Sequence, residues 1–475
     1  METFKTEIVV LGGGPGGYAA AHYASDKGKK VILVDMEPRL GGVCLNRGCI
    51  PSKALLHIAH LIAEAKESAH KGIVFGEPKI ELDKLRAWKN KMIDQLSAGI
   101  KSVGKAKGVE VLQGRGYFED SKTLRVETSE GQKFVKFDQA IIAVGSKPAL
   151  PAAFDLGNPR VMTSTEALDL EEIPETLLII GGGYIGMELG TVYSTFGSEI
   201  TMVEAMGSLL MGADTDLARP VVKYAKENFK EVRLNTKVLK MATSGRHIKV
   251  ISETEGVQKE ELFDKVLVSI GRTPNSFNLG LENTIIQKDE KSFIKVNDQQ
   301  QTNDPAIYAI GDVAGGLLLA HKASKEARIA VDAITGESHA SHADLLIPAV
   351  VYTDPEIAWC GLTESEAKAK NIQVKVSKFP WSASGRAMSL GRTEGLTKLI
   401  IEPETDRILG VGITGVGAGD LISEGMLAVA MGATALDLAE TIHPHPTLSE
   451  TLMECAESFY GVSAHAISPK RKVEE

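Results

Sequence analysis

Cys44 and Cys49 are the side chains in this sequence whose type and spacing most suggest chemistry, and they lie in the segment GGVCLNRGCIPSK. The chain has 4 cysteines in 475 residues, which is too few for a secreted disulfide scaffold. A close pair in a reducing compartment is more often catalytic or metal-binding than structural. Their spacing does not match a zinc knuckle, and no second pair completes a site. We therefore predict no metal and a redox role for the pair.

The spacing of the two cysteines also constrains the local backbone. In an ideal helix, residues five apart are separated by about 7.5 Å along the axis, whereas a disulfide needs Cα atoms less than about 7 Å apart. The turn must therefore be distorted, and Gly48 and Pro51 are placed to distort it. A strained bridge is easily reduced, as a working redox bridge should be. The alternative, two buried free thiols, leaves the glycines of this segment unexplained.

Two glycine-rich loops, residues 12–17 and 181–186, each follow a strand-like apolar run and precede a helical stretch. After each helix comes a second strand that ends in an acid, Asp35 or Glu204, about 20 residues on. This is the βαβ dinucleotide-binding pattern, present twice. One such loop alone could be a glycine-rich turn, but two copies with their acids make that alternative remote.

The three glycines of each loop have separate roles: a tight turn, approach of the backbone to a pyrophosphate, and close packing of helix on strand. They are Gly12, Gly14 and Gly17 in the first loop, and Gly181, Gly183 and Gly186 in the second. The N-terminus of the following helix then offers free N–H groups to the phosphates.

We expect Asp35 and Glu204 to accept hydrogen bonds from a ribose. A carboxylate at Glu204 would repel a 2′-phosphate, and residues 205–208 supply no arginine to bind one, so NAD is favoured over NADP. The alternative is that Glu204 is only a solvated acid at a strand end. Nicotinamide moves hydride and a dithiol reacts through thiolates, and a flavin can couple the two. The first loop is therefore assigned to FAD and the second to NAD.

The length of 475 residues suggests about three domains. Strand-like runs at residues 140–145 and 265–271 close the two βαβ units, and residues 306–312 form another buried strand. After about residue 345, strand-like runs alternate with helical patterns in an α+β manner. We predict an α/β fold with two Rossmann-like domains at 1–148 (FAD) and 149–273 (NAD). A central segment, 274–345, completes the FAD site, and an α+β domain follows at 346–475.

The formal net charge of −9 argues against general nucleic-acid binding, which requires a basic face. No apolar run approaches the roughly 18 residues of a membrane span, so none is predicted. A strand-like run begins at residue 7 and leaves no room for a signal or transit peptide. We expect the bacterial cytoplasm, although a processed organellar protein would look similar.

With these features the chain resembles the class I pyridine nucleotide-disulfide oxidoreductase family, and within it the dihydrolipoamide dehydrogenases. The likeness covers nearly the whole chain. It rests on the motifs GGVCLNRGCIPSKALLH, GGGYIGMELGTVY, IGRTPN, YAIGDVAGGLLLAHKA, FPWSASGRA and HPHPTLSE.

The resemblance implies a role for each matching residue. Cys44 would meet the substrate and Cys49 would face the flavin, with Lys53 and Glu188 as a buried ion pair beside the ring. Further FAD contacts would come from Gly42, Lys53, Gly116, Gly145, Asp312 and Ala320, and further NAD contacts from Val238, Gly271 and Arg272.

His445 and Glu450 match the family's catalytic base and its orienting carboxylate. The residue types agree with this, because a thiolate is the nucleophile toward a disulfide and a histidine titrates near neutral pH. Glu450 can hold the ring and stabilise the imidazolium, as the carboxylate does in a triad. Without the cysteine pair, a structural histidine would be the better interpretation of His445, and we assign that role to His443.

The resemblance also implies the reaction and the partners. It implies oxidation of protein-bound dihydrolipoamide to lipoamide with reduction of NAD, in an obligate homodimer in which His445 serves the other subunit's cysteines. The lipoyl group would be carried by acyltransferase subunits of 2-oxo acid dehydrogenase complexes or by glycine cleavage H protein.

Two alternatives stay open at this stage. One is a glutathione-type reductase, which would use NADP, and the other is a non-catalytic structural subunit, against which the intact cysteine pair argues. Arg47 and Pro444 depart from the family pattern; Arg47 could lower a thiolate pKa or point to solvent, and Pro444 could shift His445.

Overall fold

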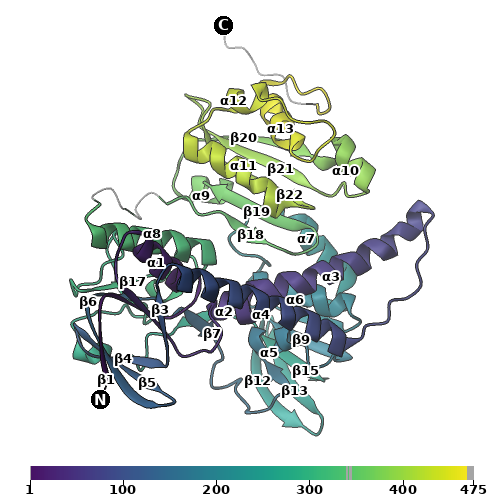
Figure 1. The fold of residues 1–475 in the computed structure, drawn as a ribbon. Helices are drawn as coiled ribbons and strands as arrows, with labels where there is room; N and C mark the ends of the chain where they lie inside the picture. The colour runs from purple at the N-terminus through teal and green to yellow at the C-terminus, as the bar shows by residue number, and fades with distance from the viewer. Residues whose placement is uncertain (1, 338–340, 342–344, 468–475) are drawn as a thin grey trace.

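Three large sheets, of seven, five and five strands, organise the chain, each with its own helices (Figure 1). The computed structural model describes residues 2–337, 341 and 345–467. Apolar clusters fill the space between each sheet and its helices. In Figure 1 the C-terminal sheet lies at the top of the molecule and the other two lie below it.

The first sheet has the order β3-β2-β1-β6-β5-β4, and a further strand, β17, pairs with β6. Its parallel strands are buried at the centre of the sheet, as their apolar runs predict, and mostly exposed at its edge, in the run Glu110–Gln113. They are β1 (Glu2–Leu11), β2 (Val31–Asp35), β3 (Glu110–Gln113), β6 (Gly131–Ile142) and β17 (Ile307–Ala309). The antiparallel strands are β4 (Arg115–Asp120) and β5 (Thr123–Thr128).

The helices of this part connect and cover the first sheet. Helix α1 (Pro15–Asp26) joins β1 to β2 and packs against α8 (Ala320–Thr335). Between β2 and β3 lie α2 (Gly42–Arg47), α3 (Cys49–Glu67), the 3-10 turn η1 (Ser68–Lys71) and α4 (Leu82–Ala106). Before α8 lie the short turns η2 (Leu281–Asn283) and η3 (Gly311–Ala314).

The second sheet has the order β11-β10-β9-β15-β8, and its pairs are parallel. Its strands are β8 (Val161–Met162), β9 (Thr176–Ile180), β10 (Glu199–Val203), β11 (Glu231–Arg233) and β15 (Lys265–Val268). An antiparallel sheet of β12 (Thr236–Ser244), β13 (His247–Thr254) and β14 (Val257–Phe263) precedes β15. The helices of the five-stranded sheet are α5 (Ser164–Asp169), α6 (Tyr184–Thr195) and α7 (Thr215–Asn228).

A two-stranded pair, β7 (Ser146–Pro148) and β16 (Arg272–Pro274), joins the first two sheets. The pair brings the end of the first βαβ unit against the end of the second. It lies across two of the predicted domain boundaries, and β17 carries the central segment into the first sheet. The boundaries at 148, 273 and 345 therefore stay predictions.

The third sheet is antiparallel with the order β18-β19-β22-β21-β20. Its strands are β18 (Ala349–Val351), β19 (Glu356–Gly361), β20 (Lys375–Pro380), β21 (Leu396–Ile401) and β22 (Ile408–Gly415). Its helices and 3-10 turn are α9 (Glu364–Ala369), η4 (Trp381–Ala383), α10 (Gly385–Leu390), α11 (Ala418–Met431), α12 (Ala435–Glu440) and α13 (Glu450–Tyr460).

The predicted fold class, two Rossmann-like units followed by an α+β domain, is confirmed. Both glycine loops lie between a parallel strand and a helix, as the βαβ pattern requires. Among the residues that the structure describes, no helix is both long and apolar enough to cross a membrane.

Candidate active site

The cysteine pair lies at a break between two helices. Helix α2, which carries Cys44, ends at Arg47, and α3 begins at Cys49. Between them Gly48 has φ −147° and ψ −115°, and a Cβ there would lie 2.9 Å from the carbonyl oxygen of Val43. The predicted distortion is confirmed at Gly48. Pro51 lies within the first turn of α3 and contributes no break, because a proline there costs no helical hydrogen bond.

The two thiols are free and hydrogen-bonded to each other. That hydrogen bond, together with burial, raises the pKa of Cys44. Receiving it lowers the pKa of Cys49 to about 7, and the charge of Lys53 acts in the same direction. Cys49 is therefore the thiol that ionises near neutral pH.

Lys53 and Glu188 form the predicted ion pair, with Nζ 2.8 Å from Oε2 and 3.0 Å from Oε1. Glu188 is on α6, which packs against α3. Its carboxylate also accepts hydrogen bonds from Ser52 Oγ at 2.8 Å and from the backbone N–H of Tyr352 at 3.1 Å. Burial opposes the charge of Lys53, but Glu188 outweighs burial and raises the pKa of the lysine.

The first glycine loop forms one wall of a cavity of about 610 Å³. Gly12 has φ +106°, and a Cβ on it would overlap the carbonyl oxygen of Ala143. A Cβ on Gly17 would overlap the carbonyl oxygen of Gly12, so this glycine lets α1 approach the strand. Among the described residues, no side chain caps the start of α1, which leaves its N–H groups for a ligand.

Most residues predicted for the FAD site and for the redox chemistry line this one cavity. They are Gly12, Gly14, Asp35, Gly42, Cys44, Cys49, Lys53, Gly116, Gly145, Glu188, Asp312 and Ala320. The volume is that of a typical cofactor pocket. The structure thus brings together residues from distant parts of the sequence, 12–53, 116–145, 188 and 312–320.

The second glycine loop repeats the geometry of the first. Gly181 also has φ +106°, and a Cβ on Gly186 would overlap the carbonyl oxygen of Gly181. A Cβ on Gly183 would meet no described atom within 4 Å, so a ligand can approach its backbone. The predicted NAD residues Gly181, Gly183, Gly186, Glu204, Val238 and Gly271 are not among the described residues that line the cavity of the first loop.

Asp35 and Glu204 hold their loops in the same way. Asp35 accepts a hydrogen bond from the N–H of Gly13, and Glu204 accepts one from the N–H of Gly182 at 2.7 Å. Burial raises the pKa of Asp35 despite its two backbone hydrogen bonds. Glu204 is therefore positioned at the loop and is not simply a solvated acid at a strand end.

Arg272 lies on the FAD side of the junction, although the resemblance places it against NAD. Its Nε donates to Ser146 Oγ at 2.7 Å and lies 3.7 Å from Asp312 Oδ2, and its Nη2 donates to the carbonyl of Ser146 at 2.7 Å. Asp312 also accepts a hydrogen bond from Ser146 Oγ. The three residues tie β7, β16 and η3 together at the cavity wall.

His445 and Glu450 form the predicted pair in the third sheet's region. His445 Nδ1 lies 2.9 Å from Glu450 Oε1, and the ring is 74% exposed. Burial opposes ionisation of Glu450, but the N–H of Thr447 and the ring of His445 outweigh it and lower the pKa of the carboxyl. Neither residue is among the described residues that line the cavity, and α13 lies in the upper part of the molecule, above α2 (Figure 1). Within one chain, this histidine therefore does not line the cavity that holds the cysteines.

The neighbours of this pair agree with the sequence interpretation. His443 is 4% exposed and contacts Glu424 Oε1 at 2.6 Å, in keeping with a structural role. Pro444 leaves the pair of His445 and Glu450 in contact. Arg47 is 38% exposed, and its Nη2 pairs with Glu37 Oε1 at 2.8 Å on the cavity wall.

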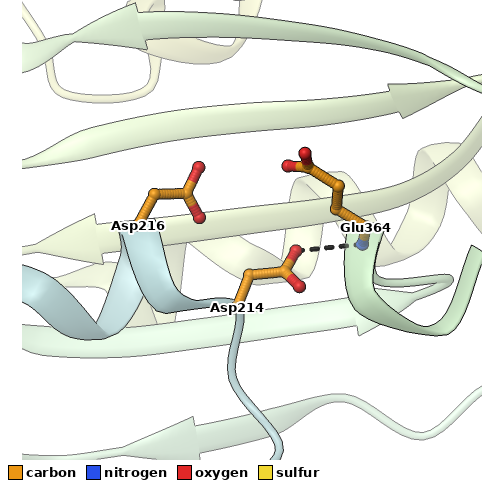
Figure 2. A group of neighbouring side chains, drawn as sticks. All are labelled: Asp214, Asp216 and Glu364. Atoms are coloured by element: carbon orange, nitrogen blue, oxygen red, sulfur yellow. Dashed lines mark hydrogen bonds between the residues drawn. The ribbon is translucent and has the colours of Figure 1, made fainter. Parts of the chain in front are cut away.

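Among the described residues, three carboxylates outside the cavity lie close enough together to hold a metal ion: those of Asp214, Asp216 and Glu364 (Figure 2). Asp214 and Asp216 lie at the start of α7 and face Glu364 at the start of α9. The Nζ of Lys398 lies 2.6, 2.9 and 3.0 Å from their oxygens, and Lys378 pairs with Asp216. Lysine charges therefore take the place that a cation would have.

Sequence reasoning missed three residues of the site. Ser52 lies inside a quoted motif but carried no signal of its own, whereas Ser146 and Tyr352 come from other parts of the chain. Only their tertiary contacts reveal them.

The residues present fit both cofactors. A dinucleotide needs a glycine cradle, a free helix N-terminus and a ribose-binding acid, and each loop supplies all three. The first cavity also places the cysteine pair on its wall, where a flavin would meet it.

Comparison with known proteins agrees with this site. Residues 6–327 match the pyridine nucleotide-disulphide oxidoreductase family, and residues 347–456 match the dimerisation domain of that family. The dihydrolipoyl dehydrogenase of Vibrio cholerae is 44% identical over 469 residues, 98% of each chain. That of Staphylococcus aureus is 42% identical over 98% of each chain.

Solved structures share the whole fold. LpdA from Mycobacterium tuberculosis superposes with a TM-score of 0.88 at 28% identity, over 96% of this chain and 99% of that one. The flavoprotein disulfide reductase RclA from Escherichia coli gives 0.85 at 27% identity, over 95% of this chain and 99% of that one. With its two nucleotide loops, its cysteine pair and its dimerisation domain, this chain belongs to the pyridine nucleotide-disulphide oxidoreductase family.

Proposed function

We propose that this chain oxidises protein-bound dihydrolipoamide to lipoamide and delivers the two electrons to NAD. The observation that carries the proposal is the position of Cys44 and Cys49 on the wall of the first nucleotide cavity, beside Lys53 and Glu188. Relatives at 42% and 44% identity over 98% of their length are dihydrolipoyl dehydrogenases, which supports the same substrate here.

Each residue of the site has a separate part in the proposed thiol–disulfide exchange. His445 of the partner subunit accepts a proton from one substrate thiol, and the thiolate attacks Cys44 Sγ in the oxidised pair. The Cys44–Cys49 bond breaks and Cys49 leaves as a thiolate, stabilised by Lys53. The second substrate thiol then displaces Cys44, which takes up the proton of that thiol, and the lipoamide ring closes. Bound FAD supplies the two-electron step between the Cys49 thiolate and NAD.

The ring of His445 is exposed and does not line the cavity that Cys44 and Cys49 line in its own chain, which supports a shared site in a homodimer. The dimerisation domain at residues 347–456 supports the same assembly. We further propose lipoyl-bearing acyltransferase subunits or glycine cleavage H protein as electron donors, and the cytoplasm of a bacterium as the compartment. The bacterial relatives and the four cysteines support that compartment.

A steady-state assay with dihydrolipoamide, comparing NAD with NADP, tests the proposal. We expect turnover with NAD, because Glu204 would repel a 2′-phosphate. The Cys49→Ser variant should be folded and yellow but at least about a thousandfold less active. Cys360→Ser, which changes a buried thiol on β19, is the matched control and should remain active. Full lipoamide turnover by Cys49→Ser would rule out the mechanism.

A further inference from the structure

Tyr352 belongs to the part of the chain that forms the third sheet, and it contacts the ion pair of Lys53 and Glu188 beside Cys49. It directly follows β18, and the Lys53 Nζ lies 4.5 Å from the centre of its ring. Its backbone N–H donates to Glu188 Oε1 at 3.1 Å. One residue thus contacts both members of the ion pair beside Cys49.

The ammonium of Lys53 has a direction left for this ring. An ammonium has three N–H donors, and two contacts from Nζ go to Glu188, at 2.8 Å to Oε2 and 3.0 Å to Oε1. The face of the Tyr352 ring lies within the range in which a cation is attracted to an aromatic quadrupole. This attraction is greater where water is excluded.

The ring itself is held in place by the start of α11. A Cβ added to Gly419 would lie 3.2 Å from Tyr352 Cε1 and 3.0 Å from Val350 Cγ1. Because both contacts are tighter than ordinary van der Waals distance, the glycine leaves just enough room for the ring. The ring therefore lies against the start of α11 as well as against Lys53.

We propose that Tyr352 is a positioning residue for the ion pair beside Cys49: its ring holds the Lys53 ammonium where that charge stabilises the Cys49 thiolate, and its backbone N–H holds the Glu188 carboxylate that pairs with the ammonium. The inference rests on the proposed function, because it assumes that this thiolate works against a bound flavin. It makes the third sheet's region part of the redox centre of its own subunit.

Several charged or titratable groups act on Cys49 or feel its charge. They are Cys44 on α2, Lys53 on α3, Glu188 and Tyr184 on α6, and Tyr18 on α1. Under the proposed function, His445 of the partner subunit joins them. Lys53 is the cation in this set, and its charge lowers the pKa of Cys49. Without the ring, the lysine is free to turn toward solvent.

The test uses the FAD-loaded protein, reduced anaerobically with one equivalent of dihydrolipoamide and titrated with pH. A thiolate against oxidised flavin gives a long-wavelength charge-transfer absorbance, which reports the pKa of Cys49. We expect Tyr352→Leu to raise that pKa by about half a pH unit or more. Tyr352→Phe keeps the ring and the N–H, so it should titrate like the parent. If the leucine variant does not fold, Tyr352→Met carries the same expectation.

Phe459→Leu is the matched control, because it removes another aromatic ring that lies under a lysine, Lys375, in the third sheet's region. It should leave the pKa of Cys49 unchanged. A parent-like titration of Tyr352→Leu overturns the inference, as does an equal rise in Phe459→Leu, which would indicate general loosening. Absence of the absorbance in the parent protein itself contradicts the proposed function, and the inference fails with it.

Discussion

Lys53 and Lys398 both pair with carboxylates, but they differ in what else each ammonium faces. Lys398 is 1% exposed and contacts Asp214, Asp216 and Glu364 within 3.0 Å. Lys53 is 31% exposed, pairs with Glu188, and lines the cavity of the first nucleotide loop.

The difference separates a structural joint from a reactive site. At Lys398 the three N–H donors face three carboxylates, and Asp214 also accepts hydrogen bonds from the N–H groups of Glu364 and Ser365. This ties the start of α7 to the start of α9 and leaves no donor for a ligand. At Lys53 the charge faces a cavity and a thiol that ionises near pH 7. Lys398 is structural because its donors meet three carboxylates, whereas Lys53 has one carboxylate partner and its charge acts on Cys49.

Lys398→Met is expected to have the largest effect, and on stability alone. It leaves three carboxylates facing one another with Lys378 as the remaining cation, and an uncompensated buried charge costs about 3–5 kcal/mol. Thermal and urea unfolding measure the loss. The folded fraction should keep kcat within about twofold, because the group lies outside the active site. A variant of parental stability would show that the network contributes nothing.

Lys53→Met should show the opposite pattern, a large loss of activity with a smaller loss of stability. Without the lysine, Glu188 acts on Cys49 uncompensated and raises the pKa of that thiol. We expect turnover of dihydrolipoamide to fall by about a hundredfold, and stability to fall by about 1–2 kcal/mol, because Glu188 keeps its hydrogen bonds from Ser52 and Tyr352. The measurements are kcat and the unfolding midpoint of the loaded protein. Equal stability losses in the two methionine variants, with kcat unchanged in both, would remove the distinction.

Acid should weaken the Lys398 network in a defined pH window. Burial opposes ionisation of Asp214, but Lys398, Ser365 and two backbone N–H groups hold its pKa at about 2, below the ordinary 3.8. A carboxyl with a lowered pKa contributes its full stability above the unfolded value and loses it as pH falls toward the folded value. Between pH 4 and pH 2 we therefore expect a loss of about 2 kcal/mol, measured as the free energy of unfolding. Asp214→Asn should flatten that part of the curve; a curve as steep as the parent's would contradict this assignment.

The surroundings of the two lysines also show which features can be predicted from the sequence and which cannot. The glycine loops, their acids and the cysteine pair were predictable because each pattern lies within one short stretch whose backbone needs are local. Glu188 was placed correctly through resemblance, since nothing in its own segment points toward Cys49. Roles of individual residues in catalysis and in binding NAD stay predictions.

Contacts between distant segments could not be predicted in this way. Tyr352 is 164 residues from Glu188, and Lys398 is 182 from Asp216, and neither contact has a periodic or local signal. The contact between Arg47 and Glu37 could not be predicted either. The two residues are 10 apart in the sequence, but the path of the chain between them has to be known first. Pairings of this kind are set by packing between elements, which a single sequence does not encode locally.

Gly419→Ala is the smallest and most selective change. A Cβ there would meet the Tyr352 ring at 3.2 Å and Val350 at 3.0 Å, so the ring must move by a few tenths of an ångström. Alanine is the better helix former within α11 by up to about 1 kcal/mol, which offsets the crowding, so the unfolding midpoint should hardly change. The titration of Cys49 should nevertheless shift, by less than in Tyr352→Leu, because the ring and Lys53 move together. An altered unfolding midpoint with an unaltered Cys49 titration would mean that the ring position does not govern Lys53.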